Sequence, residues 1–347
     1  MYKRQILKQW DKGQQVIFEA NPDYYGEKAK IKKVTVLFMD EDAALAAAMA
    51  GEVDVAHTAA SLADEKIDGY GLLSVTSVDN RGINLPTVKA SEKDGKTVGN
   101  DVTSDVAIRR AMNIGIDREE MIKNVLNGHG TAAYSVCDKM PWYNEESEVT
   151  YDQKSAKALL EEAGWKEGKD GIREKDGVRA EFTVMFNPDD SVRQALAEDF
   201  ANQCKELGIE VKTEGAGWDV AYDKALSQPL VWGWGAHTPM ELYNIYHTGT
   251  DSDSAEYSPY ANETVDHYMD EALQADTLED SYDLWKKAQW DGTTGVTQDG
   301  DIPWIWFCNV DHLYYVRDGL KVAEQKIHPH GHGWSIVNNV DQWEWSK

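Results

Sequence analysis

The chain has 347 residues, of which 41% are hydrophobic and 28% charged, the proportions of an ordinary globular protein with room for two domains. Its 61 acidic residues against 35 basic ones give a formal net charge of -26, which argues against nucleic-acid binding and against attraction to an anionic membrane surface. No apolar run is long enough to span a membrane. Three widely separated cysteines predict buried free thiols and neither a disulfide framework nor a zinc ribbon: Cys137, Cys204 and Cys308.

Strands and helices alternate in the first part of the chain. Val16 and Phe18 lie in a short predicted strand, and residues 31–39 form a near-continuous apolar run typical of a strand covered on both faces. Residues 40–51 predict a helix, and 53–57 predict the next strand. This strand–helix–strand order favours a parallel pair with a right-handed crossover.

A polar, glycine-containing loop and three capped helices follow. The loop over 89–101 is predicted to mark a domain boundary. Asp105 and Asp152 are expected to begin the first and third helices, while Asp117 and Glu120 form a capping box for the second. These helices carry no nucleophile, metal-ligand pair or phosphate loop, so they are interpreted as scaffold.

The remaining chain repeats the α/β pattern. Strands are expected over 180–188, 209–215, 229–237, 303–310 and 312–320, and helices over 191–207, 217–228, 262–274 and 281–290.

The order and spacing of four segments resemble one family. These are "AALAAAMAGEVDVA", "IRRAMNIGIDREEMIKNVLNG", "SAKALLEEAGW" and "IPWIWF". Together they resemble the extracellular solute-binding proteins, family 5, of peptide and nickel ABC importers. The resemblance implies an α/β, two-lobed periplasmic-binding-protein type II fold of the large peptide/nickel-binding class. It also implies a non-enzymatic, monomeric receptor that delivers solute to ABC permease subunits from a periplasmic or lipid-anchored, extracytoplasmic position.

The N-terminal sequence "MYKRQILKQW" lacks the apolar segment and cleavage site of an export signal. In members of the family, the strand that resembles this N-terminal sequence follows a long preceding segment. The chain is therefore interpreted as N-terminally truncated. The predicted lobes are 1–85 for an incomplete lobe I, 86–300 for lobe II, and 301–347 for the return to lobe I. Missing neighbours predict exposed apolar surface and an unpaired sheet edge near 31–39 and 304–310.

The strand end over 229–246 is the main candidate for a ligand site, because ligands bind outside the carboxyl ends of parallel strands. Aromatic walls with a few polar groups suit an orienting pocket. Packing of the two tryptophans in the core is the alternative. The candidates are Trp232, Trp234, His237, Glu241 and Tyr243, with Trp142 as a weaker one.

One position departs from the family pattern. Peptide-binding relatives commonly place an Asp soon after the Gly-Trp pair to hold the ligand's amino terminus, and His237 occupies that position here. A neutral imidazole cannot form the same charge-assisted bond with an ammonium group, although Glu241 could substitute. Without that substitute, the ligand is not a peptide with a free amino terminus. The resemblance itself implies an oligopeptide ligand, with nickel or another metal complex as the alternative.

Three alternating histidines near the C-terminus form a second candidate site. His328, His330 and His332 could bind nickel, zinc or copper, in which case the metal is the transported ligand and no resident cofactor is expected. The spacing matches no standard metal motif, and a loop whose histidines bond to backbone is the alternative.

Enzyme motifs are lacking: the sequence has no GxSxG, HExxH, P-loop or GxGxxG pattern. Thirteen tryptophans would suit sugar stacking, so an oligosaccharide-binding protein or a carbohydrate-active enzyme remains the remoter alternative.

Overall fold

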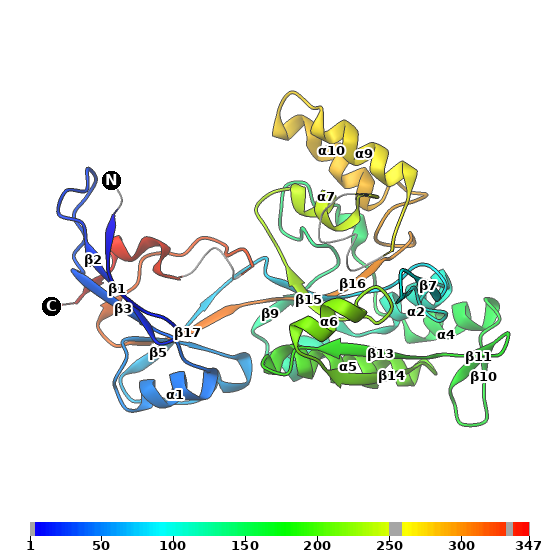
Figure 1. The fold of residues 1–347 in the computed structure, drawn as a ribbon, viewed down its shortest axis with the longest axis horizontal. Coiled ribbons are helices and arrows are strands. Elements are labelled where there is room, and N and C mark those ends of the chain that lie inside the picture. Colours follow the sequence, from blue (N-terminus) through cyan, green and yellow to red (C-terminus); the bar gives the residue numbers. More distant parts are fainter. Residues whose placement is uncertain (1–3, 250–258, 331–335, 347) are drawn as a thin grey trace. The chain divides into compact units, whose positions relative to one another are not determined.

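The computed structural model describes residues 4–249, 259–330 and 336–346 (Figure 1). The chain divides into two compact units, unit 1 with Met1–Ser77 and Asp311–Lys347, and unit 2 with Val78–Val310. Two strands assigned to lobe I by the sequence, β6 (Asn80–Asn84) and β16 (Trp304–Val310), fall in unit 2. The lobe boundaries drawn from the family resemblance stay a prediction.

Unit 1 contains two three-stranded antiparallel sheets, in the orders β1-β2-β3 and β4-β17-β5. A short two-stranded sheet joins β18 to β19. The elements of unit 1 are β1 (Gln5–Asp11), β2 (Gln15–Ala20), β3 (Lys33–Leu37), α1 (Glu41–Met49), β4 (Val55–Thr58), η1 (Ala60–Leu62), β5 (Tyr70–Val75), β17 (His312–Arg317), β18 (Leu320–Lys321), η3 (Ile336–Gln342) and β19 (Glu344–Trp345).

The parallel strand pair predicted around α1 is wrong. β3 pairs with β2, whereas β4 pairs antiparallel with β17 in a different sheet. β17 comes from more than two hundred residues further along the chain, and its first four residues are buried. A strand order based on neighbouring segments could not include this distant partner.

The predicted exposed edge is confirmed in one place and wrong in the other. β3 lies at the edge of its sheet, and Leu37, Phe38 and Met39 are 41%, 49% and 44% exposed. β16, in contrast, lies between β6 and β9 (Gly130–Ala132), and all seven of its residues are buried. Its apolar run therefore reflects a strand with a neighbour on each side.

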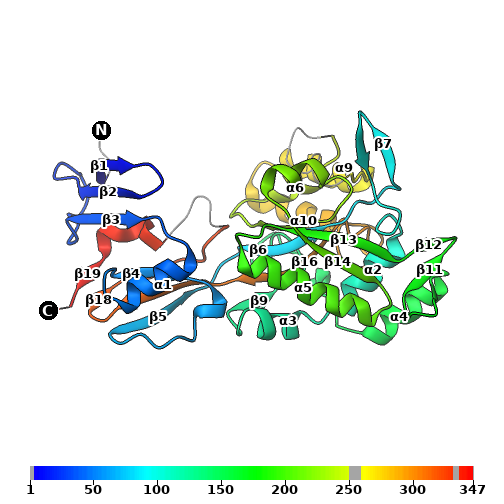
Figure 2. The same cartoon turned by 60° about the horizontal axis from the view of Figure 1, so that its bottom comes forward.

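Unit 2 is built on a four-stranded sheet in the order β15-β6-β16-β9 and on a parallel pair, β13 and β14, connected by α5. The predicted strand–helix–strand of this region is confirmed, and Figure 2 shows α5 lying along the pair. The loop predicted as a domain boundary forms the β7–β8 hairpin within unit 2. The other elements are β7 (Ser91–Lys93), β8 (Lys96–Val98), α2 (Val106–Gly115), α3 (Arg118–Val125), β9 (Gly130–Ala132), η2 (Glu145–Ser147), α4 (Gln153–Glu162), β10 (Lys166–Glu167), β11 (Arg173–Lys175), β12 (Val178–Arg179), β13 (Glu181–Phe186), α5 (Ser191–Glu206), β14 (Glu210–Gly215), α6 (Trp218–Lys224), β15 (Val231–Trp234), α7 (Met240–Tyr246), α9 (Glu263–Leu273) and α10 (Leu278–Gln289).

The three predicted helix caps are confirmed, but the reciprocal half of the Asp117–Glu120 capping box is not formed, because the Asp117 N–H donates to Oε1 of Gln203. The Asp105 carboxylate accepts a hydrogen bond from the backbone N–H of Ala107, and the Asp117 and Asp152 carboxylates cap α3 and α4 in the same way. Each cap satisfies an amide that the first helical turn leaves without a partner. Within the described ranges, no helix combines the length and apolar character needed to cross a bilayer.

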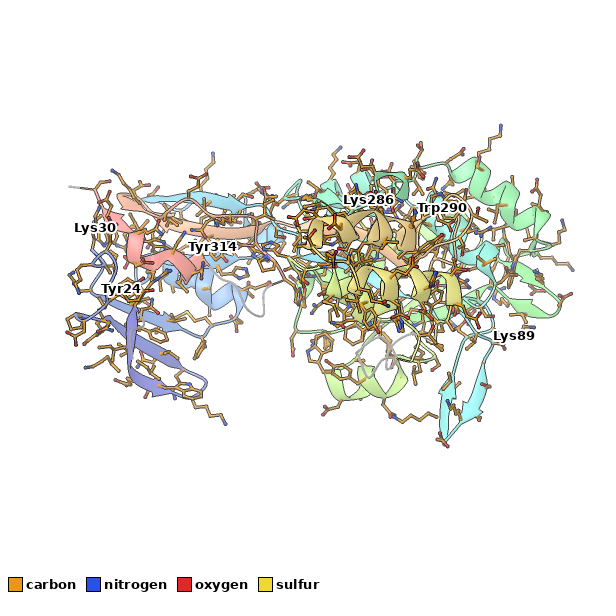
Figure 3. All side chains as sticks on the ribbon, turned by 90° about the horizontal axis from the view of Figure 1, so that it is seen from above. Tyr24, Lys30, Lys89, Lys286, Trp290 and Tyr314 are labelled. Atoms are coloured by element: carbon orange, nitrogen blue, oxygen red, sulfur yellow. The ribbon has the colours of Figure 1, made fainter. Side chains whose placement is uncertain are left out.

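A helical hairpin of α9 and α10 covers one side of unit 2 (Figure 1). Its position is fixed partly by Asn144, whose Nδ2 donates to the carbonyl oxygens of Lys286 (3.0 Å) and Trp290 (2.9 Å), both labelled in Figure 3. Trp285 of α10 is buried in the same apolar core as Trp232 of β15. The hairpin therefore supports the core behind the candidate site.

Candidate ligand-binding site

Two buried asparagines of β6 hold β15 in place. The Oδ1 atom of Asn84 accepts from the backbone N–H of Leu230 (2.8 Å) and from Nε1 of Trp232 (3.2 Å). The Oδ1 atom of Asn80 accepts from the backbone N–H of Trp234 at 3.2 Å. Satisfied polar groups in a buried setting fix a single geometry, so the aromatic side chains of β15 start from a rigid strand.

The site was predicted at the end of β15 on the assumption that β15 is a strand of a parallel sheet. Within its own four-stranded sheet β15 pairs antiparallel with β6, so the rule for carboxyl ends of parallel strands does not apply in that sheet. A parallel bridge from Leu230, the residue before β15, to Met185 joins this segment to β13 of the parallel pair. The case for a site here rests on the side chains themselves.

The chain turns sharply where β15 ends. Gly235 has φ +128°, and a Cβ atom there would lie 1.8 Å from the carbonyl oxygen of Val78. Oε1 of Glu241, in the first turn of α7, accepts a hydrogen bond from the Gly235 N–H at 3.3 Å. Glu241 thus supports the turn, and its role as an anchor for a ligand ammonium stays a prediction.

Four aromatic side chains form a continuous run, called here the aromatic run: Tyr222, Trp218, Trp232 and Trp234. Trp218 stacks on Trp232 with ring centroids 5.8 Å apart, and Trp232 stacks on Trp234 at 6.3 Å. Exposure rises from 5% for Trp232 to 46% for Tyr222. The run therefore begins in the core and ends at the surface.

The sequence identified only the β15 half of this run. Trp218 and Tyr222 are spaced by four residues on α6, which places both on one helix face and would have been the signal for them. Burial of Trp232 agrees with the core-packing alternative for that residue, whereas Trp234 is only partly buried.

The other predicted ligand-binding residues lie around the same core. Trp142 is buried, with its ring 6.0 Å from that of Tyr282. Tyr243 packs against the core and stacks on His247 at 4.3 Å. His237 is exposed in the loop after β15. The structure therefore brings Trp142, Trp232 and Trp234 into one cluster and leaves His237 at its surface.

Two arginines lie beside the aromatic run, and the sequence did not single them out. They are Arg81 of β6 and Arg193 of α5, called here the arginine pair. Arg81 forms an ion pair with Asp79, and Nη1 of Arg193 lies 3.2 Å from the Asp190 carboxylate. The Arg193 guanidinium lies 5.3 Å from the ring centroid of Trp218.

The arginine pair is electrostatically coupled. Burial, together with the positive charge of Arg81, lowers the pKa of Arg193 to about 10 against the opposing effect of Asp190. Burial also opposes the charge of Arg81, but Asp79 outweighs this effect and raises its pKa. Both groups stay protonated at neutral pH, so two cations share one buried region.

Comparison with known proteins identifies the family. Residues 6–256 match the model of the bacterial extracellular solute-binding proteins, family 5, middle region. The chain belongs to this family. The resemblance inferred from the four sequence segments is confirmed.

Two curated relatives and one solved structure illustrate the likeness. Protein XP55 of Streptomyces lividans is 32% identical over 90% of this chain and 56% of its own length. The oligopeptide-binding protein AppA of Bacillus subtilis is 31% identical over 77% of this chain and 49% of its own length. The chain thus spans about half the length of these family 5 relatives.

The solved structure is NikZ from Campylobacter jejuni in complex with Ni(L-His). It is 24% identical, with a TM-score of 0.80 over 99% of this chain and 68% of that chain. The predicted fold class, the mixed α/β fold of a type II periplasmic binding protein, is confirmed.

The predicted histidine cluster lies in unit 1. His328 is fully buried, with Nδ1 3.0 Å from Nδ1 of His312 and Nε2 3.2 Å from Oε1 of Gln325. His330 is partly buried, and His332 lies outside the described residues. Over 4–249, 259–330 and 336–346, no three His, Cys, Asp or Glu side chains are placed to hold a metal ion. A metal role for these histidines stays a prediction.

Proposed function

We propose that this chain is the solute-binding part of an ABC importer and that it captures an oligopeptide at the aromatic run of unit 2. The observation that carries the proposal is the run itself, because stacked rings from Trp232 to Tyr222 offer a graded apolar surface next to charged groups. The printed name of AppA, an oligopeptide-binding protein, supports the ligand class. Family membership supports the further proposal that the solute is delivered to permease subunits and that the protein acts outside the cytoplasm.

The proposed binding needs no chemical step. Aromatic faces would hold apolar side chains of the peptide, and a small number of polar groups would fix its orientation. Because Asn80 and Asn84 already order β15, little conformational entropy is lost at this strand on binding. The solute would then favour the conformation that the permease recognises.

His237→Asp is expected to strengthen binding of peptides with a free amino terminus by about tenfold, because a carboxylate forms a charge-assisted bond with an ammonium group. The measurement is calorimetric titration with one peptide in its free-amine and N-acetylated forms. The acetylated form should bind both proteins equally. His267→Asp, at an exposed position of α9, is the matched control and should change neither affinity. Equal gains for both peptide forms would count against a ligand amine at this position.

Calorimetry with three kinds of solute tests the proposed function. A pool of short peptides should release or absorb heat, whereas cello- and xylo-oligosaccharides should not. Nickel with L-histidine is the second candidate, favoured by the Ni(L-His) complex of NikZ. Heat with nickel–histidine alone would replace the peptide assignment. Heat with oligosaccharides alone would remove both assignments, and turnover of a glycan would support an enzyme instead.

A further inference from the structure

We infer that Asp138 and Asn309 form a proton-dependent latch that couples solute binding at the aromatic run to pH. This inference rests on the proposed function and adds a means of regulation to it. Its starting point is an unsatisfied acceptor. In the part of the chain that the structure describes, Oδ1 of Asn309 is buried and has no hydrogen-bond partner, while Nδ2 of the same amide donates to Oδ2 of Asp138 at 3.3 Å. An unsatisfied buried acceptor costs free energy and needs an explanation.

A proton on Asp138 would supply the missing donor. An ionised carboxylate can only accept hydrogen bonds, whereas a neutral carboxyl group offers one O–H donor besides its acceptor oxygen. A primary amide offers the complementary pair, so neutral Asp138 and Asn309 can each donate to the other and accept from it. The terminal torsions of both side chains are soft, which allows the small rotation that the second contact needs. The latch is this two-way pair.

The contacts of the Asp138 carboxyl group suit a neutral acid. The residue is buried, and its donors lie at 3.2 Å (Tyr134 N–H), 3.2 Å (Ser135 N–H) and 3.3 Å (Asn309 Nδ2). Hydrogen bonds to an ionised group are usually shorter, about 2.7–2.9 Å. Burial raises the pKa of Asp138 to about 7 against these three hydrogen bonds and the charge of Lys139. Geometry and burial therefore agree on a carboxyl group that is neutral in mild acid.

The other titratable groups around Asp138 keep their charge in this range. Burial lowers the pKa of Arg118 to about 10, and it raises the pKa of the neighbouring tyrosines and of the Cys137 thiol. Among these described groups that burial shifts, only Asp138 changes charge between about pH 5.5 and 8.5. The groups that interact with Asp138 are Arg118 of α3, Tyr134, Cys137, the exposed Lys139 and Tyr143 of its own loop, and Tyr246 of α7.

Hydrogen bonds connect the latch to the aromatic run. Asn309 is the register partner of Asn80 on β6. Nδ2 of Asn80 donates at 2.9 Å to the carbonyl oxygen of Val136, in the loop over 133–144 that also carries Asp138. Oδ1 of Asn80 accepts from the backbone N–H of Trp234 at 3.2 Å. Asn80 therefore contacts both the loop of the latch and the end of β15.

The neutral acid is the form that favours binding. With the latch formed, the 133–144 loop, Asn80 and β15 keep one arrangement, so less conformational entropy is lost when solute binds. Ionisation of Asp138 places a charge in a buried setting, and outward movement of the loop relieves that cost. The contribution to affinity is therefore present in mild acid and is lost as the pH rises through about 7.

Calorimetry at two pH values measures the effect on binding. The probe is an N-acetylated tetrapeptide with a free carboxylate and no ionisable side chain, because its charge is constant between about pH 5.5 and 8.5. The parent protein should bind it about fivefold more weakly at the higher pH. Asp138→Asn keeps a donor and an acceptor for Asn309, so its affinity should match the acid-pH value of the parent at both pH values. The ratio of parent to variant affinity cancels other titrating groups.

Asp199→Asn is the matched control. Burial also raises the pKa of Asp199, on α5, but its carboxylate accepts from Nε2 of Gln203 in the same helix at 2.6 Å. This variant should keep the fivefold change of the parent. Urea unfolding of both variants checks that they fold.

NMR of the unaltered 347-residue protein observes the proton itself. The ¹³C signal of the Asp138 carboxyl group, assigned with Asp138→Asn, should titrate with a midpoint near 7. Because coupling is reciprocal, saturation with the tetrapeptide should raise this midpoint by about 0.7 of a pH unit, which corresponds to fivefold. A midpoint below about 5 would overturn the latch, whatever the protein binds.

The outcomes separate the two claims. Peptide binding with a parent-to-variant ratio that is the same at both pH values would overturn the coupling and keep the peptide receptor. A midpoint that peptide leaves in place would do the same. Absence of peptide binding at either pH would overturn the proposed function and, with it, the coupling.

Discussion

Gly235→Ala is expected to lower the free energy of unfolding by at least about 3 kcal/mol, because the added methyl group has no room. The added Cβ would lie 1.8 Å from the backbone carbonyl oxygen of Val78, and no side-chain rotation can separate these two atoms. The φ of +128° adds strain for any residue with a side chain. Urea unfolding, followed by tryptophan fluorescence, measures the change.

Gly217→Ala is the matched control for this substitution. Gly217 caps α6 with φ -63°, and a Cβ atom there would meet nothing within 4 Å. Its replacement should change the unfolding free energy by less than about 0.5 kcal/mol. If the two variants unfolded at the same urea concentration, the tight turn between β15 and α7 would not exist as described.

Asp138→Asn is expected to remove a strong pH dependence of stability. The buried Asp138 carboxylate accepts hydrogen bonds from the backbone N–H groups of Tyr134 and Ser135 (both 3.2 Å) and from Nδ2 of Asn309 (3.3 Å). Burial nevertheless dominates and raises its pKa from 3.8 to about 7. Between these two values the folded protein binds a proton that the unfolded chain does not.

The sign of the effect follows from that difference. The contribution of Asp138 to stability is fully present below about pH 4 and is lost as the pH rises through about 7. An asparagine stays neutral throughout. The unfolding free energy of the variant minus that of the parent should therefore rise by up to roughly 4 kcal/mol from pH 4 to pH 8.

Urea unfolding of both proteins at several pH values measures this difference directly, and other titrating groups cancel in it. Asp219→Asn, at an exposed position on α6, is the control and should give a small, flat difference. A flat difference for Asp138→Asn as well would mean that Asp138 is ionised in the folded protein at low pH, with its burial offset by the three hydrogen bonds.

Local signals predicted much of the fold. The caps at Asp105, Asp117 and Asp152 and the β13–α5–β14 unit were predictable because the residues that decide them are close in sequence. Sheet partners were not predictable in the same way. The pairing of β4 with β17 and the central position of β16 depend on segments far apart in the chain.

The candidate site shows the same division. Trp232 and Trp234 stood out because they are close together on one strand. Arg81 and Arg193 could not be distinguished from charges at the surface, since their nearness to the aromatic run arises only when β6 and α5 pack together. Charges that converge only in the folded state leave little trace in a single sequence.

The central claim is that solute binds at the aromatic run of unit 2. Its most direct test is ¹⁹F NMR of protein labelled with 5-fluorotryptophan, with signals assigned by single Trp→Phe replacements, during titration with the peptide pool. Peptide should shift the signals of Trp218 and Trp234 and leave that of Trp165, which is buried elsewhere in the unit, unchanged. Peptide binding that moves neither Trp218 nor Trp234 would contradict the claim.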